Sequence, residues 1–73
     1  MDRTPVRSSN IRSVGYDANE QTLEIEFTSW AIYQYFGVPL HVHEGLMMAR
    51  SKGTYFNEHV KDKYRFKQIR RAR

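Results

Sequence analysis

Two runs with a two-residue hydrophobic period, TLEIEF at 22–27 and AIYQYF at 31–36, are separated by only three residues, and this spacing constrains the fold more than any other feature. In the first run, three apolar side chains alternate with Glu24 and Glu26, which is typical of a strand with one buried and one solvated face. Strands joined so closely pair antiparallel. The sequence therefore predicts a β-hairpin, with both glutamates on its solvated face.

The connection at 28–30 decides the register of this hairpin. It contains Trp30 where tight loops usually place Gly or Asn in the left-handed conformation. A three-residue loop with Trp30 in that conformation pairs Ile25 with Tyr33, and it brings both strand tyrosines to the apolar face. A two-residue loop would place Gln34 opposite Ile25 and leave its amide poorly partnered. We therefore predict the three-residue loop, with Trp30 exposed at its tip.

The rest of the chain predicts one more strand and two helices. A strand covers about 10–16, after an irregular N-terminal segment. Beyond the second run the period becomes helical, which predicts helices at about 39–50 and 53–62. The alternating segment YRFKQI at 64–69 could add a short fourth strand. We predict an α+β fold: a three-stranded antiparallel β-meander followed by two helices packed on one face.

The predicted core lies between the apolar face of the hairpin and the two helices. A domain this small buries only about 60% of its unfolded surface, so truncation of one large core side chain such as Phe56 should unfold it. Glu24→Ala, on the solvated face, should have almost no effect. The core residues are Leu23, Ile25, Phe27, Val42, Leu46, Phe56 and Val60.

The length of 73 residues predicts a single domain over 1–73, with a core at about 6–66 and a basic tail at 67–73. This size argues against a separate catalytic module or a deep active-site cleft. The sequence has no cysteine, no apolar run of the roughly 20 residues that span a membrane, and no signal-peptide pattern. We expect a soluble cytoplasmic protein without a membrane partner.

The positive charge is concentrated at one end of the sequence. Residues 1–60 carry five basic and seven acidic side chains, whereas residues 61–73 carry seven basic side chains and Asp62 alone as an acid. The first part therefore has a formal charge of −2 and the second +6. A solvated terminus and a polyanion-binding site both account for such a segment. Its cations are Lys61, Lys63, Arg65, Lys67, Arg70, Arg71 and Arg73.

Four blocks of the sequence, SSNIRSVGYD, TLEIEF, YQYFGVP and EGLMMARSKGTYFNEHVKDKY, resemble successive parts of the KTSC domain family. This family is named for its occurrence at the C-terminus of some lysyl-tRNA synthetases, and the resemblance covers about residues 6–64. The resemblance implies no defined activity, and nucleic-acid association is suggested only by the synthetase context. The chain departs from the family pattern at Trp30, where the pattern has Gly, and at His43, where VHEGL replaces Val-Tyr-Glu-Gly-Leu.

The histidines do not follow a metal-binding pattern. His41 and His43 are two residues apart, so on a helix they point about 200° from each other, and the i, i+4 spacing of helical zinc sites is absent. Neither Glu44 nor Glu58 supplies a recognisable ligand spacing to them or to His59. We therefore expect no metal and no cofactor.

No catalytic motif is present either. The serines lack a nucleophile motif, and no glycine-rich phosphate loop precedes a helix. The block SKGTYFN could place Tyr55 and Asn57 in a polar site, but Ser51 as a helix cap and Asn57 as a loop anchor explain it better. We expect no catalytic residues, no enzymatic activity and no small-molecule substrate.

The basic end also contains aromatic residues. Tyr64 and Phe66 lie among its lysines and arginines, and cations interleaved with flat rings suit a nucleic acid, RNA or single-stranded DNA. The competing interpretation makes both rings core residues of a last strand. The alternative function is protein–protein interaction through the hairpin tip at Trp30 or through a sheet edge, and Trp30 could instead fold back as a packing residue.

Overall fold

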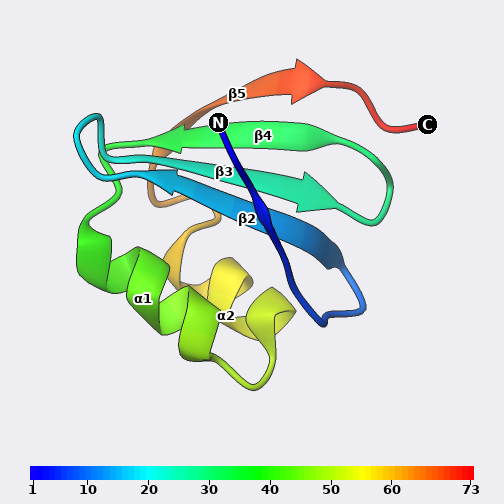
Figure 1. Ribbon diagram of the computed structural model, residues 1–73, viewed down its shortest axis with the longest axis horizontal. Helices are drawn as coiled ribbons and strands as arrows, with labels where there is room; N and C mark the ends of the chain where they lie inside the picture. Colours follow the sequence, from blue (N-terminus) through cyan, green and yellow to red (C-terminus); the bar gives the residue numbers. More distant parts are fainter.

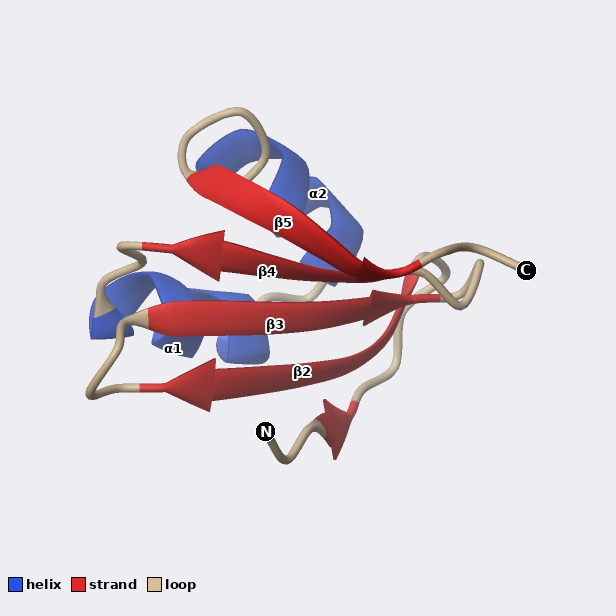
Figure 2. Ribbon diagram, turned by 90° about the horizontal axis from the view of Figure 1, so that it is seen from above, coloured by secondary structure: helices blue, strands red, loops and turns tan.

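In the computed structural model, which describes residues 1–73, five antiparallel strands form one sheet and two helices cover one of its faces (Figures 1 and 2). The strand order is β1-β2-β3-β4-β5, so β3 is central and β1 and β5 are the edges. The elements are β1 (Thr4–Pro5), β2 (Ile11–Asp17), β3 (Thr22–Phe27), β4 (Ile32–Phe36), α1 (Leu40–Met48), α2 (Lys52–His59) and β5 (Arg65–Arg70).

The predicted α+β class is confirmed, but the predicted number of strands is too low. The three-stranded meander corresponds to β2, β3 and β4, and the sheet also contains β1 and the full-length edge strand β5. Strand β1 has only two exposed residues, one of them Pro5, so it has no hydrophobic period to detect. The possible fourth strand at 64–69 is present as β5, although none of its residues is buried.

The hairpin has the predicted register. Leu23 pairs with Tyr35 and Ile25 with Tyr33. Trp30 has a φ of 78°, and its amide donates a hydrogen bond of 2.9 Å to the carbonyl oxygen of Phe27. Both the three-residue loop and the left-handed Trp30 are therefore confirmed.

The helices pack on the apolar face of the hairpin as predicted. Helix α2 begins after Ser51, whose hydroxyl accepts a hydrogen bond of 3.3 Å from the Thr54 amide. The two helices pack closely at Gly45, which has no side chain. A Cβ atom at this position would lie only 2.2 Å from the Tyr55 hydroxyl oxygen. Neither helix is long and apolar enough to cross a membrane. The fully buried residues of the core cluster include Leu23, Ile25, Leu46 and Val60, with Val42 and Phe56 almost fully buried and Phe27 packed against them.

The interpretation of Glu24 and Glu26 as solvated side chains is wrong. Glu24 is 3% exposed and Glu26 is 8% exposed, although both lie on the face that the helices leave open. Arg3 pairs with Glu24, and Arg70 pairs with Glu26. Arginines from the two ends of the chain therefore cover this face, and their charges offset the cost of burying the carboxylates.

Candidate nucleic-acid interface

Five aromatic rings cluster on the helix-facing side of β3, β4 and β5. The Phe56 ring packs edge-on against Phe27 and against Tyr35, with centroids 5.4 Å apart in both pairs. The Phe66 ring lies 5.8 Å from Tyr33 and 6.0 Å from Tyr35. These five residues are called the aromatic cluster below. Phe66 is its most exposed member, at 59%, whereas Tyr35 and Phe56 are each 6% exposed.

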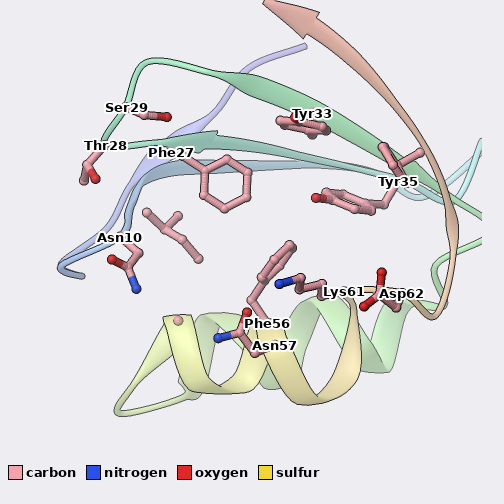
Figure 3. A pocket seen from close by; sticks show the side chains of 13 residues that line it. Asn10, Phe27, Thr28, Ser29, Tyr33, Tyr35, Phe56, Asn57, Lys61 and Asp62 are labelled. Atoms are coloured by element: carbon pink, nitrogen blue, oxygen red, sulfur yellow. The ribbon is translucent and has the colours of Figure 1, made fainter. Parts of the chain in front are cut away.

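A cavity of about 530 Å³ opens between the aromatic cluster and helix α2. We call it the aromatic groove (Figure 3). Asn10 lies at one end, Lys61 and Asp62 at the other, and Asn57 on the helix. The size of the domain had argued against a deep cleft. The groove lies between α2, which passes behind β4 and β5 in Figure 2, and the rings of β3, β4 and β5.

The Tyr35 hydroxyl is a polar group within the aromatic lining of the groove. The residue is only 6% exposed, and its hydroxyl points from β4 toward Phe27 and Phe56 (Figure 3). Burial above all, then the proximity of Tyr33 and Asp62, raises the pKa of Tyr35 to about 12. The hydroxyl is thus a neutral hydrogen-bond donor at physiological pH. None of the side-chain hydrogen bonds of the protein involves this hydroxyl or the side-chain amides of Asn10 and Asn57.

Three of the seven cations of the basic segment lie in the edge strand of the sheet. Arg65, Lys67 and Arg70 lie within β5, and the backbone amide of Arg73 donates a hydrogen bond of 2.8 Å to the carbonyl oxygen of Ser29. Of the seven cations, only Arg70 forms an ion pair. The other six, among them Lys61 at the mouth of the groove, have no acidic partner.

Trp30 lies apart from the groove, among arginines. The guanidinium carbon of Arg12 is 4.0 Å from the centre of the indole ring, and those of Arg73 and Arg70 are 5.5 Å and 5.8 Å from it. The ring is half-buried rather than freely exposed, and the Nε of Arg70 donates a hydrogen bond of 2.7 Å to the Trp30 carbonyl oxygen. The indole ring does not fold back over Tyr33 and Tyr35 as a packing residue. The ring contacts of these two tyrosines are with each other and with Phe27, Phe56 and Phe66.

The sequence allowed either a core role or a ligand-binding role for Tyr64 and Phe66, and the structure divides the two roles between them. Tyr64 is half-buried and packs against the core, whereas Phe66 is mostly exposed at the groove. Asn57 anchors no loop, because its exposed amide lines the groove without a hydrogen bond. No local sequence pattern indicates the groove, because its walls come from β2, β3, β4, β5 and α2.

The histidines lie outside the groove. No group of three or more histidine or acidic side chains is arranged to hold a metal ion. His43 stacks on Tyr16 with centroids 4.6 Å apart, and its buried Nδ1 has no hydrogen-bond partner. Burial lowers the pKa of His43, and the nearby Glu44 opposes this effect only in part.

The chain is similar in sequence and in structure to known proteins of one family. The KTSC domain profile matches residues 7–64. An uncharacterized protein of Stutzerimonas stutzeri is 44% identical over 94% of this chain and 99% of its own length. A lysine–tRNA ligase of Nostoc punctiforme is 46% identical over 84% of this chain, which corresponds to 11% of the ligase. The crystal structure of a KTSC domain protein from Yersinia pestis superposes with a TM-score of 0.92, at 43% identity, over 94% of this chain and 97% of that one.

Proposed function

The chain belongs to the KTSC domain family, and from this premise we propose that it is a small non-catalytic module that binds single-stranded nucleic acid along β5 and the mouth of the aromatic groove. The observation that carries the proposal is the position of Phe66. Its ring is 59% exposed and touches Tyr33 and Tyr35, and its neighbours Arg65 and Lys67 have no acidic partner. A base can stack on this ring while the cations contact the phosphates.

The order of β5 makes this surface more effective than a flexible basic tail. The strand pairs with β4 from Phe36 to Ile32, so the sheet fixes the spacing of its cations. A fixed array loses less conformational entropy on binding than a mobile segment does. Arg70 contributes less to a phosphate surface than the sequence suggested, because Glu26 already pairs with it.

The relatives favour RNA over DNA as the polymer. A related segment occurs in proteins named lysine–tRNA ligase, whose named substrate is an RNA. Unpaired RNA also exposes the base faces that a ring such as Phe66 can stack on. We therefore expect single-stranded RNA to bind more tightly than duplex of the same sequence.

The test is an anisotropy titration of labelled single-stranded RNA, single-stranded DNA and duplex at several salt concentrations. Four phosphate contacts to a single strand predict a slope of log affinity against log salt of about −3. The pair Arg65→Gln and Lys67→Gln should make this slope less steep by about 1.4 units. The control pair Arg7→Gln and Arg50→Gln also removes two exposed, unpaired cations, but from outside β5 and the groove lining, and it should change the slope much less.

Phe66→Ala tests the stacking contact separately from the charges. We expect it to weaken single-strand binding by about 1–3 kcal/mol and to leave the salt slope unchanged. Absence of binding to every nucleic acid at low salt, or an equal effect of both arginine-containing pairs, would remove the proposal.

A second candidate function is binding of a protein strand to the free edge of β5. As an edge strand, β5 leaves one row of backbone amides and carbonyls without partners in the sheet. Peptide binding at this edge would depend little on salt and would survive neutralisation of Arg65 and Lys67. Under this alternative, Trp30 at the neighbouring hairpin is a further contact for the partner.

A further inference from the structure

We propose that the aromatic groove holds one unstacked nucleobase of the bound strand, with the Tyr35 hydroxyl and the Asn57 amide at the base edge and a phosphate beside Lys61. The inference rests on the proposed function and extends it from backbone binding to recognition of a base. It assigns a binding site to a cavity that the sequence did not reveal.

The groove has the size and walls that a flat heterocycle needs. Its volume of about 530 Å³ lies within the range of about 300–1,000 Å³ of small-molecule sites. Phe27, Tyr33 and Phe66 supply ring faces and edges along it. Aromatic walls of this kind hold bases that have been turned out of a stacked strand.

The Tyr35 hydroxyl indicates that a polar ligand enters. The residue is 94% buried, and the hydroxyl has no partner within the protein. The hydroxyl is open to the groove, so a ring nitrogen or carbonyl oxygen of a base can take the place of water as its acceptor. The free amides of Asn57 and Asn10 add donors and acceptors at the mouth, and Asp62, the only acidic residue of the lining, adds an acceptor for an exocyclic amino group.

The charges around the groove select among occupants that aromatic walls could hold. A methylated lysine or another cation would suit such rings and the carboxylate of Asp62, but Lys61, which lines the groove and has no ion pair, would repel it. An apolar peptide side chain would leave the Tyr35 hydroxyl unsatisfied. A nucleotide combines a flat polar ring with a negative charge, and it matches all three features.

The first experiment titrates AMP, GMP, CMP and UMP into the isotopically labelled protein and follows its amide and aromatic NMR signals. At least one nucleotide should shift the signals of Tyr35, Phe56 and Asn57. The corresponding nucleoside should shift the same signals, whereas ribose 5-phosphate, which carries the charge without the base, should not. A response to ribose 5-phosphate equal to that of the nucleotides would overturn the proposal.

The second experiment removes single polar groups. Tyr35→Phe should weaken nucleotide binding about five-fold, as expected for the loss of one neutral hydrogen bond, and it should leave the melting temperature unchanged because that hydroxyl has no partner in the free protein. Tyr55→Phe makes the same change on α2, outside the groove lining, and serves as its control. Asn57→Ala, compared with the adjacent Glu58→Ala, tests the amide in the same way.

The outcomes separate this inference from the proposed function. Single-stranded RNA that binds with the expected salt slope, while Tyr35→Phe behaves like Tyr55→Phe, would overturn base recognition in the groove and leave β5 binding intact. Nucleotide binding that depends on Tyr35, together with RNA binding that the pair Arg65→Gln and Lys67→Gln does not change, would support the groove and contradict the β5 surface. Saturable binding of N-acetylphenylalaninamide in the groove, without any nucleotide response, would identify a peptide site instead.

Discussion

The guanidinium group of Arg70, in the edge strand β5, pairs with the buried carboxylate of Glu26, in the central strand β3. The two side chains reach each other across Ile32 of β4, which is in register with both residues. The Ser13 hydroxyl donates a hydrogen bond of 2.8 Å to the other carboxylate oxygen of Glu26. One acidic side chain thus connects three strands on the face of the sheet that carries no helix.

Glu26→Gln should lower the free energy of unfolding by about 1–3 kcal/mol at neutral pH, because it removes a charge from a buried hydrogen-bonded pair. Burial by itself would raise the pKa of Glu26, but hydrogen bonds from Ser13 and Arg70 and the charges of Arg3 and Arg70 outweigh it and lower the pKa below the usual 4.5. The stabilisation is therefore complete above pH 4.5 and is lost as the pH falls through the lowered pKa.

Urea unfolding of the parent and of Glu26→Gln at pH 7, 5 and 3 checks this prediction. The difference between the two proteins should shrink at the lowest pH. Glu58→Gln, at an exposed position without an ion pair, is the control. A difference that grows as the pH falls would contradict the role of the carboxylate.

Glu24→Ala should also destabilise the protein, by about 1–3 kcal/mol, in contrast to the almost silent effect predicted from the sequence. The Glu24 carboxylate accepts a hydrogen bond of 2.8 Å from Gln34 and pairs with Arg3, so its removal leaves two partners unsatisfied. Chemical unfolding measures the effect. The additional substitution Arg3→Ala should cost less in Glu24→Ala than in the parent.

Phe56→Ala and Phe66→Ala should differ sharply in stability although both remove one ring of the aromatic cluster. Phe56 is 6% exposed and contacts Phe27 and Tyr35, so its truncation should cost about 3–5 kcal/mol. Phe66 is 59% exposed, so its truncation should stay within about 0.5 kcal/mol of the parent. Thermal melts of the two variants decide the point, and similar losses for both would place Phe66 in the core.

His43→Tyr should remove part of the pH dependence of stability. Burial lowers the pKa of His43 below the usual 6.5, so the folded state disfavours protonation. The contribution of neutral His43 is complete above pH 6.5 and is lost as the pH falls through the lowered pKa. The tyrosine keeps a ring for stacking on Tyr16. Melting temperatures at pH 7.5 and 5 should therefore differ less in His43→Tyr than in the parent, whereas His41→Tyr, at an exposed position, should leave the difference unchanged.

Trp30→Gly should leave stability within about 1 kcal/mol of the parent. It relieves the left-handed strain of a residue with φ of 78° and loses a partly exposed contact with Arg12, two effects of similar size. Since Trp30 is the only tryptophan, its fluorescence reports on this position alone. Iodide should quench it more strongly than caesium, because the surrounding arginines attract anions. Equal quenching by the two ions would show that these guanidinium groups do not stay near the ring.

The hairpin was predictable because its information is local. The period of two, the three-residue gap and the burial cost of Gln34 together determine the register, and Trp30 adopts the conformation that this register requires. The core residues of the helices follow from the same kind of local period.

The open face and the groove were not predictable for the opposite reason. Glu24 and Glu26 alternate like solvated residues, and their burial depends on Arg3 and Arg70, which lie 21 and 44 positions away in the sequence. The groove likewise joins Asn10 to Phe66. A pattern within one strand cannot show which distant side chains will cover it.

The composition of β5 also has a consequence for local unfolding. All six of its residues are exposed, so backbone hydrogen bonds to β4 and the Arg70 side chain hold it in place with little apolar burial. Segments of this kind open at a lower free energy than the core. Amide protons of β5 should therefore exchange with deuterated water faster than those of β3, and a strand of RNA bound along the edge should slow their exchange. The same segment would then open more readily than β3 in the free domain and gain protection from its ligand.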